Sequence, residues 1–578
     1  MRARLSLATD KVSRRNIPRG LFVVQTHGDS QIWNGGLSER ILTCCRTDFG
    51  RLAPDPIEIT GEFTLSTRCS RSPMSAIRKR IQLFCFANAS RAATSLRSVT
   101  HRPRSGRGPR SPRPRFPQVI EDTDMNALID AEVTPSAAPK SGSVQSAAAA
   151  PAASAISTPR AGSTRDATKQ GVFNASPGMP GLFRSHFDFM MARNFCAGGY
   201  GEGGAAGECF STAHRIADGD VESWTVAWRH TAERVERLAK DCLRGGHDVS
   251  AREAFLRASM YWGSAFFYLA PTDPRHREMY MRHRSCFRQA ARLFSPAIEP
   301  VSIPYENGKT LPGYFMRTVG ADGPRPTVMI ITGGDGTCEE LYFWGGGAAA
   351  VRRGYNAFLW EGPGQVGAYT LDPELTYRPD WEVPTRYAVD YVLSREDVDP
   401  ERLALSGHSM GGYFAPRAAA YEKRLTAVIA NSLLPEWKPA AMVLMGFDPG
   451  EPYGTDLESR VNLSDMMIKW FATQIKVRMG SGGDSVAAFF DKCGAYSLAG
   501  LEGKITCPLL SIAGEAEGPL MLATGHQFYE KLICPKAEHV VSLVEGGEAH
   551  CTMNNPSLKH QIEFDWLDDV FKNNTNCR

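Results

Sequence analysis

The chain has 578 residues, which is longer than one small domain and favours several domain-sized parts. Its composition, with 42% hydrophobic and 22% charged residues, is typical of a soluble globular protein. A net charge of +4 is too close to balance to indicate nucleic acid or a membrane surface as a partner. No run of about 18 uninterrupted apolar residues is present, which argues against a transmembrane helix.

The 14 cysteines are scattered along the chain. They form no CxxC pair and no cluster with histidine at zinc-site spacing, so reduced thiols are favoured over a disulfide framework. The first residues lack the basic and apolar segments of a secretory signal, and we expect a cytoplasmic protein. Because no phosphate-binding loop, dinucleotide fingerprint or HExxH motif occurs, we expect no cofactor and no metal.

Residues 1–179 are predicted to be a disordered, low-complexity extension. Residues 101–115 alternate Arg with Pro, Ser and Gly, and residues 141–164 are rich in Ala, Ser and Pro. Such segments bury too little apolar surface to offset the entropy that ordering costs. The Arg-rich piece also fits a nucleic-acid or targeting arm, and a true start at Met125 or Met179 stays open.

Residues 180–298 are predicted to form a helical cap domain. Apolar residues recur at a spacing of three to four along one face of its first long helix. Ser250–Glu253 has the form of a capping box that opens the next helix, and a third helix runs from Tyr280 to Phe294, before Pro296. A protein-binding scaffold of helical hairpins has the same pattern. The residues of the expected apolar face are Trp224, Ala227, Trp228, Val235, Leu238 and Cys242.

Residues 299–578 are predicted to be an α/β-hydrolase core with a doubly wound, mostly parallel sheet. Short apolar runs alternate with helical stretches, which is the pattern of parallel strands joined by helices. The expected strands are Thr327–Thr332, Asn356–Trp360, Arg402–Ser406, Thr426–Asn431, Pro508–Ala513 and Val540–Val544. The expected helices are Glu339–Arg353, Asp380–Arg395, Gly411–Tyr421 and Leu520–Leu532. Residues 437–500 form a mostly helical insertion that we expect to be part of a cap.

Ser409 is the predicted nucleophile. It lies in Gly407-His408-Ser409-Met410-Gly411, directly between an expected strand and an expected helix. This context makes the GxSxG pattern specific, because the sharp turn exposes the serine Oγ and the flanking glycines prevent a clash with the strand or helix. The Met410 N–H is then a candidate donor to the developing oxyanion.

The base and the acid are expected downstream, because this fold orders its triad as serine, acid and histidine. His550 follows the last expected strand and is the predicted base. The acid is expected in the loop after Pro508–Ala513, where no Asp occurs, so we predict Glu517 with Glu515 as the alternative. Its carboxylate holds the histidine tautomer and stabilises the imidazolium.

The loop 332–337 follows the strand that conventionally supplies the second oxyanion donor, and Gly334 is the candidate. Asp335 in this loop either acts as a proton donor, if burial raises its pKa, or caps the loop. Glu361–Gln365 is expected to be a structural turn on the pocket rim.

These motifs resemble the FrsA-like α/β-hydrolase group. The group contains 2,6-dihydropseudooxynicotine hydrolase and the fungal yellowish-green-type pigment hydrolases that shorten polyketides. The resemblance covers about residues 180–570. The matching segments are Gly219–Trp224, Ser250–Ala254, Leu311–Tyr314, Gly333–Thr337, Glu339–Tyr342, Gly362–Gln365 and Gly407–Arg417.

The resemblance implies a Ser-His-acid triad with a site between the core and the helical domain. It also implies cleavage of a carbon–carbon bond next to a ketone, and it makes Asp335 a catalytic candidate, because one relative has an acidic residue at this place. Two departures are Glu361 and Val366, which replace the usual Asp and Gly. Glu517 likewise replaces the usual aspartate.

The sequence therefore predicts a serine hydrolase that performs a retro-Claisen cleavage of a polyketide-like or diketone substrate in secondary metabolism or pigment biosynthesis. Rival functions are an ester or peptide hydrolase, acyl transfer or condensation on the same triad, and a binding scaffold with an inactive core. The expected partner is a small molecule, with a homodimer left open.

Overall fold

The computed structural model describes residues 179–320, 323–450, 452, 454 and 456–576, together with four short strands nearer the N-terminus. The chain divides into two units, residues 1–115 and 116–578. In the first unit, β1 (Leu21–Thr26) pairs with β2 (Asp29–Asn34), and β3 (Glu58–Gly61) pairs with β4 (Ile81–Phe84), both antiparallel. The rest of the predicted disordered extension lies outside the described residues.

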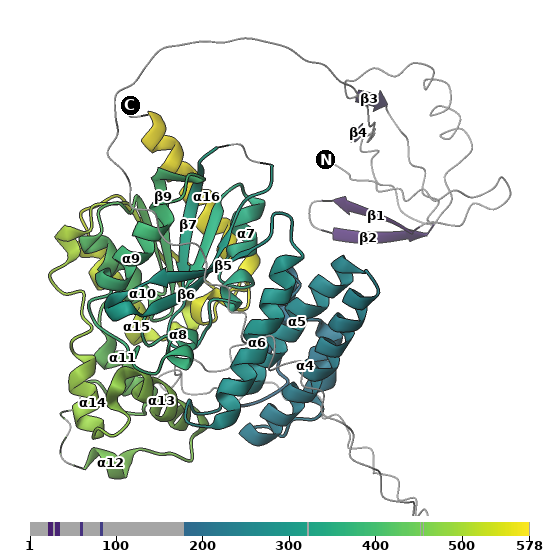
Figure 1. Ribbon diagram of the computed structural model, residues 1–578. Coiled ribbons are helices and arrows are strands. Elements are labelled where there is room, and N and C mark those ends of the chain that lie inside the picture. The colour runs from purple at the N-terminus through teal and green to yellow at the C-terminus, as the bar shows by residue number, and fades with distance from the viewer. Residues whose placement is uncertain are drawn as a thin grey trace, which may run out of the picture. The chain divides into compact units, whose positions relative to one another are not determined.

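Five helices form the predicted helical domain (Figure 1). Asp220 caps the long helix α4 by accepting the Glu222 N–H, and the helix buries Trp224 and Trp228 completely. Leu238, which was expected on the apolar face of this helix, is 42% exposed. The helices are α2 (Phe187–Gly201), α3 (Ala206–Ala213), α4 (Val221–Arg244), α5 (Asp248–Phe266) and α6 (Pro274–Arg292).

Helix α5 begins two residues before the expected capping box. Its N-cap is His247, and Ser250 already lies within the first turn. The box pattern therefore marks the start of this helix only approximately, because the hydrogen bonds that cap a helix depend on where the preceding turn ends.

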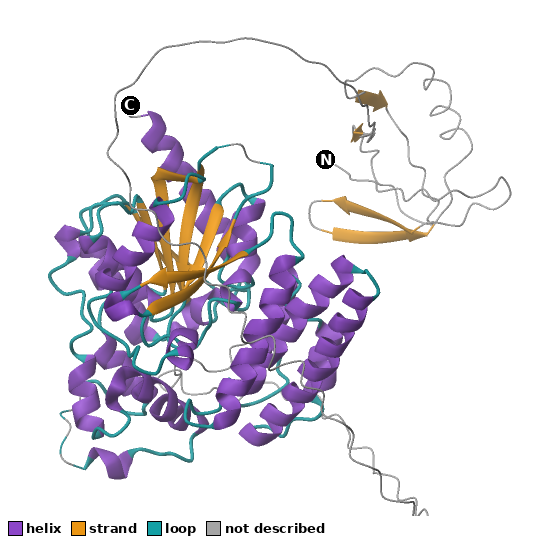
Figure 2. Ribbon diagram, viewed as in Figure 1, coloured by secondary structure: helices purple, strands orange, loops and turns teal. Residues whose placement is uncertain are grey.

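The core is a single eight-stranded sheet, with helices on both faces (Figures 1 and 2). The strand order is β12-β11-β10-β9-β7-β8-β6-β5. The strands from β7 to β12 are parallel, whereas β6 runs antiparallel to β8 and β5 antiparallel to β6. This confirms the predicted α/β-hydrolase fold class. The strands are β5 (Glu299–Pro304), β6 (Thr310–Met316), β7 (Arg325–Ile331), β8 (Asn356–Trp360), β9 (Val398–His408), β10 (Ala427–Asn431), β11 (Leu509–Gly514) and β12 (Lys536–Val541).

Two predicted elements differ from the structure. The last strand is Lys536–Val541 instead of Val540–Val544, and Val544 is 96% exposed in the turn that follows. As an edge strand, β12 is only partly buried, so its polar residues hide it from an apolar-run search. The expected helix Glu339–Arg353 is interrupted between a 3₁₀ turn, Glu340–Tyr342, and α7 (Gly347–Arg352), because Gly346 has a φ of +105°.

The second unit also contains the helices of the core and of the insertion. Figure 1 shows the insertion helices gathered at one end of the sheet. The core helices are α7 (Gly347–Arg352), α8 (Val366–Leu371), α9 (Glu382–Leu393), α10 (Gly411–Tyr421), α15 (Pro519–Lys531) and α16 (Pro556–Asn576). The insertion contains α11 (Trp437–Leu444), α12 (Leu457–Arg460), α13 (Met466–Lys476), a π-helical turn at Val477–Ser481 and α14 (Val486–Cys493). Short 3₁₀ turns lie at Glu306–Gly308, Glu502–Lys504, Glu515–Glu517 and His550–Thr552.

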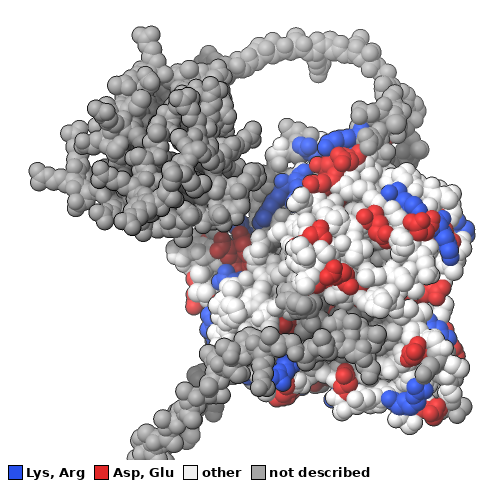
Figure 3. All heavy atoms as spheres, turned by 180° about the vertical axis from the view of Figure 1, so that it is seen from behind, with Lys and Arg blue, Asp and Glu red and all other residues white. Residues whose placement is uncertain are grey.

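Lysine and arginine side chains are interspersed with aspartate and glutamate on the visible face of the described residues (Figure 3). Within the described part of the chain, no helix combines the length and the apolar character that crossing a lipid bilayer requires.

Candidate active site

Ser409 lies on a sharp turn between the end of β9 and the start of α10. Its φ of +58° is unusual for a residue other than glycine, and such strain is typical of a nucleophile elbow. A Cβ at Gly407 would lie 2.1 Å from the Gly411 carbonyl oxygen, and one at Gly412 would lie 1.6 Å from the Ser432 carbonyl oxygen. The chain can therefore make this turn only with glycines on both sides of the serine.

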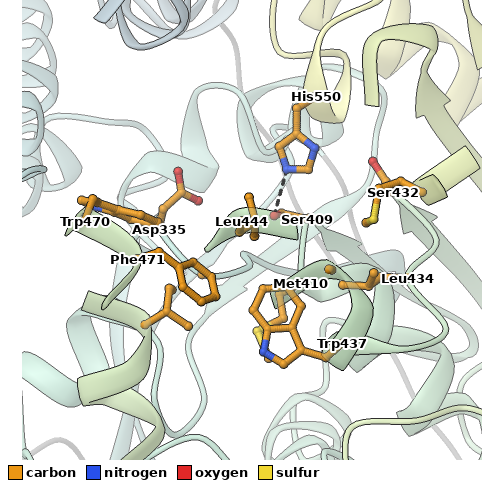
Figure 4. Close-up of a pocket in the computed structure, with 14 residues that line it drawn as sticks. Asp335, Ser409, Met410, Ser432, Leu434, Trp437, Leu444, Trp470, Phe471 and His550 are labelled. Carbon is orange, nitrogen blue, oxygen red and sulfur yellow. Dashed lines mark hydrogen bonds between the residues drawn. The ribbon is translucent and has the colours of Figure 1, made fainter. Parts of the chain in front are cut away.

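His550 and Glu517 complete a chain of hydrogen bonds that starts at Ser409. Figure 4 shows the first of these bonds, between Ser409 and His550. The Ser409 Oγ lies 2.9 Å from His550 Nε2, and His550 Nδ1 lies 2.5 Å from Glu517 Oε2. The other Glu517 oxygen accepts from the Cys551 N–H at 2.9 Å and from the Ser432 hydroxyl. With its Nδ1 proton donated to Glu517, His550 keeps Nε2 free to accept the serine proton.

The structure distinguishes between the two candidate acids and among the candidate histidines. Glu517 is 1% exposed and bonded to His550, whereas Glu515 is exposed. His526 pairs with Glu538 at 2.8 Å and His560 Nε2 donates to the Trp344 carbonyl at 3.1 Å. His550 is thus the histidine that contacts Ser409 in the described part of the chain.

The surroundings of His550 act on its pKa in opposite directions. Burial lowers the pKa, but the sulfur of Cys551 and the carboxylate of Glu517 outweigh it and hold the pKa of His550 well above its usual value. A stabilised imidazolium is what a general base needs after it has accepted a proton from serine.

The oxyanion loop, residues 332–337, packs directly against the nucleophile turn. A Cβ at Gly333 would lie 2.6 Å from both the Met410 nitrogen and the Ser409 Cβ. In the described part of the chain, neither the Met410 N–H nor the Gly334 N–H donates to a protein acceptor. Two free donors beside a nucleophile are the elements of an oxyanion hole.

Replacement of Gly333 by alanine tests this close contact. Because the new Cβ meets backbone atoms, which cannot move away as a side chain can, we expect the free energy of unfolding to fall by about 1–3 kcal/mol. We also expect acylation of Ser409 to become slower by a larger factor than the loss of stability alone would cause. Thermal denaturation and the rate of hydrolysis of an aryl ester measure the two effects. An active Gly333→Ala variant with wild-type rates would contradict this placement of the loop.

Asp335 forms an ion pair with Arg193, a residue of the helical domain. The Arg193 Nη1 donates to Asp335 Oδ2 at 2.8 Å, and its Nη2 lies 2.8 Å from Glu340 Oε1. Arg193 is buried, with the Trp344 ring 4.8 Å from its Cζ. The Asp335 side chain is 22% exposed and lines the pocket (Figure 4). Sequence reasoning missed Arg193, although a lone cation in the apolar run of α2 is a detectable signal.

A cavity lined by residues of the core and of the insertion lies above Ser409. It is mostly apolar, and much of its wall comes from α11 and α13 of the insertion (Figure 4). Its apolar lining residues include Leu434, Trp437, Leu444, Trp470, Phe471, Ile475 and Met521.

The helical domain was expected to form a wall of the site. Instead it contacts residues that line the cavity, Trp470 of the insertion and Asp335. Trp470 Nε1 donates to the Phe267 carbonyl at 3.0 Å, and the two rings stack at 5.4 Å. The insertion is therefore the immediate cap of the cavity, and the helical domain braces both this cap and Asp335.

Glu361 is not on the pocket rim, where it was expected. It is fully buried and accepts the N–H groups of Cys338 at 2.6 Å, Gly367 at 2.5 Å and Ala368 at 3.0 Å. Burial, together with the nearby Glu339, raises the pKa of Glu361 to about 7. Glu361 therefore links the residue that follows the oxyanion loop to α8, because its carboxylate accepts hydrogen bonds from backbone amides of both segments.

Two groups of buried side chains have ligand atoms close enough to share a metal ion. One is Glu517, His550 and Cys551, and the other is Cys338, Glu339 and Glu361. In the first group the two ring nitrogens of His550 already contact Glu517 and Ser409. In the second, backbone amides hold both oxygens of Glu361.

A mostly parallel sheet with a nucleophile turn after β9 and a histidine loop after β12 defines an α/β-hydrolase. No family model matches the chain. The hydrolase LUC6 of a Fusarium species is 32% identical over 396 residues, which cover 64% of this chain and 93% of that protein. The hydrolase acrC of Aspergillus aculeatus is 32% identical over 428 residues, covering 67% and 96%. The chain belongs to this family of fungal α/β-hydrolases, within the FrsA-like group that its motifs predicted.

The crystal structure of 2,6-dihydroxy-pseudo-oxynicotine hydrolase shares the fold, with a TM-score of 0.51 and 22% identity, over 66% of this chain and 95% of that one. A further relative, the 20-hydroxy-prefusarin hydrolase FUS2 of Gibberella moniliformis, is 37% identical over 238 residues. That match covers 40% of this chain and 56% of the relative.

Proposed function

We propose that the protein is a serine hydrolase that cleaves a carbon–carbon bond next to a ketone in a polyketide-like or diketone substrate. The observation that carries the proposal is the continuous chain from Ser409 through His550 to Glu517, at the floor of an apolar cavity that Asp335 also lines. The resemblance to the FrsA-like group supports the ketonic substrate, and the names of the relatives support hydrolysis.

The reaction begins when His550 Nε2 takes the Ser409 proton and Oγ forms a bond to the substrate carbonyl carbon. The Met410 and Gly334 N–H groups stabilise the resulting oxyanion. Collapse of this intermediate breaks the carbon–carbon bond, and its electron pair leaves as an enolate. His550 returns the proton to the enolate, which becomes a ketone. Water, deprotonated by His550, then releases the acyl group from Ser409 as a carboxylic acid.

Asp335 has two roles open to it. As a carboxylic acid it donates the proton to the enolate, and as a carboxylate it accepts a hydrogen bond from the enol hydroxyl of a diketone. Its 2.8 Å ion pair with Arg193 favours the second role and leaves proton delivery to His550. Both roles serve a ketonic substrate, whereas a simple ester requires neither.

An Asp335→Asn variant compares the two substrate classes. We expect cleavage of an aryl β-diketone to fall by about 10- to 100-fold, because a hydrogen bond to a charged group contributes about 1.5–3 kcal/mol. Hydrolysis of a short aryl ester by the same variant should change only a few-fold. Rates measured side by side on both substrates provide the test. Unchanged diketone cleavage would remove Asp335 from the mechanism.

An ordinary ester or peptide hydrolase is the second candidate, because the Ser409–His550–Glu517 geometry alone suffices for it. Turnover of the aryl ester with no cleavage of β-diketones would favour it. Acyl transfer or condensation on the same residues would give a product that has not gained water, which mass spectrometry detects.

A further inference from the structure

Arg478 is a buried cation in the insertion, on the π-helical turn that follows α13. Its side chain is 1% exposed, and in the described part of the chain no carboxylate forms an ion pair with its guanidinium. Burying a charge without an opposite charge is costly, so such an arginine indicates that the charge has a use where it lies.

The guanidinium is held by oxygens of the oxyanion loop and of the Gly-Pro-Gly-Gln turn. Its Nη2 donates to the Gly334 carbonyl, and its Nη1 donates to the Gly364 carbonyl at 2.9 Å and to the Tyr377 hydroxyl oxygen at 3.2 Å. The Tyr377 hydroxyl in turn donates to the Gly333 carbonyl at 3.1 Å. Burial raises the pKa of Tyr377 to about 12, so its phenol stays protonated and able to donate.

These contacts fix the orientation of two successive peptide groups. In a trans peptide the carbonyl and the N–H point in opposite directions. Because the Gly333 carbonyl points to Tyr377, the Gly334 N–H points away from it. Because the Gly334 carbonyl points to Arg478, the Asp335 N–H likewise points away from the cation. Both N–H groups therefore face away from the residues that hold the carbonyls.

The loop that carries these N–H groups lies beside the nucleophile. Gly333 packs against Ser409 and Met410, and both Gly334 and Asp335 line the cavity beside Ser409. On the insertion side, Ile475 Cδ1 lies 2.8 Å from the place of a Cβ on Gly334. One segment of the insertion thus touches the oxyanion loop twice, through Ile475 and Arg478.

We propose that Arg478 is the positioning residue of the oxyanion hole. Through Tyr377 it holds the peptide that carries the Gly334 N–H, and through the Gly334 carbonyl it orients and polarises the next peptide, whose Asp335 N–H is a further donor to the developing negative charge. This role rests on the proposed function, since it requires a tetrahedral oxyanion at Ser409. A cation hydrogen-bonded to a peptide oxygen makes the N–H of that peptide a stronger donor. The charge acts on the transition state, where the oxyanion exists, and hardly on the bound substrate.

The test is an Arg478→Met variant, assayed with a short aryl ester and two inhibitors. A phenylalkyl trifluoromethyl ketone forms a tetrahedral adduct with the serine, and the matching methyl ketone remains trigonal. We expect kcat to fall by about 10- to 100-fold with little change in KM, which is less than the loss of a direct oxyanion donor. Affinity for the trifluoromethyl ketone should fall by a similar factor, while that for the methyl ketone stays unchanged.

Lys476 offers a matched control on the same segment. It is a largely buried cation that donates to the Gly482 and Asp484 carbonyls of the insertion itself. Lys476→Met should leave both inhibitor affinities and kcat near their wild-type values. If Arg478→Met does not fold, Arg478→Lys keeps the charge with a single donor group, and we expect it to lose kcat and trifluoromethyl ketone affinity together by a smaller factor.

Three outcomes overturn the role. A rise in KM alone, or a fall in kcat with unchanged trifluoromethyl ketone affinity, makes Arg478 merely structural. Equal losses in Lys476→Met show a general loosening of the insertion. If the wild-type protein does not prefer the trifluoromethyl ketone to the methyl ketone, the proposed function itself fails. If the wild-type protein shows this preference and Arg478→Met retains it, only the role of Arg478 fails.

Discussion

Replacement of Ser409 by alanine is expected to lower kcat for any substrate by on the order of 10⁴- to 10⁶-fold. The hydroxyl on the strained turn is the atom within 2.9 Å of His550 Nε2, and alanine removes it without adding bulk. The residual rate should reflect binding and the oxyanion donors alone. Stopped assays with an aryl ester at high enzyme concentration measure this loss.

A matched control for this variant is Ser432→Ala. Ser432 also lines the cavity, but its hydroxyl donates to Glu517 and not to His550. We expect a loss of about 10-fold or less for this variant, because one hydrogen bond to the acid is removed while the nucleophile remains. Equal effects of the two substitutions would contradict the assignment of Ser409.

Replacement of Glu517 by glutamine is expected to lower kcat by about 10³- to 10⁴-fold. The amide keeps the size of the side chain, but it removes the charge that stabilises the His550 imidazolium and allows the wrong ring tautomer. The pH profile should move as well. Since Glu517 helps to raise the pKa of His550, activity in the wild type appears as pH rises through a value above 6.5.

In Glu517→Gln the pKa of His550 falls, so the remaining activity should appear at lower pH than in the wild type. Glu515→Gln is the control, because Glu515 is exposed and lies two residues before Glu517. It should keep both the rate and the pH profile. A profile that does not move in Glu517→Gln, or that moves equally in Glu515→Gln, would contradict the role of Glu517.

The strands were predictable where both of their faces are buried. The central strands β8 and β10 are fully buried, so their apolar runs are continuous, and the prediction Asn356–Trp360 matches the observed strand. At the sheet edge, β12 is mostly half-buried and begins with polar residues, and its prediction shifted toward the apolar residues of the following turn. Strands β5 and β6 were not predicted, because their Pro and Gly residues break the usual strand pattern.

Ser409, Glu517 and His550, which the structure brings into one chain of hydrogen bonds, were predictable because the order of serine, acid and histidine follows from the order of the strands. Glu517 was preferred to Glu515 from its place in the turn, and the structure brings Glu517 to His550. Arg193 and Arg478 are not placed by the strand order, and the only sign of either in the sequence is the isolated cation in the apolar run of α2. They reach the oxyanion loop from segments more than a hundred residues away in the chain, and their importance depends on burial, which spacing along the sequence does not encode.

The most direct test of Ser409 as the nucleophile is mass spectrometry after exposure to a fluorophosphonate, which phosphonylates only an activated serine. We expect one adduct per chain, on the peptide that contains Ser409, and a strongly reduced rate of labelling in a His550→Ala variant. The absence of an adduct, or an adduct on another residue, would rule out Ser409 as the nucleophile.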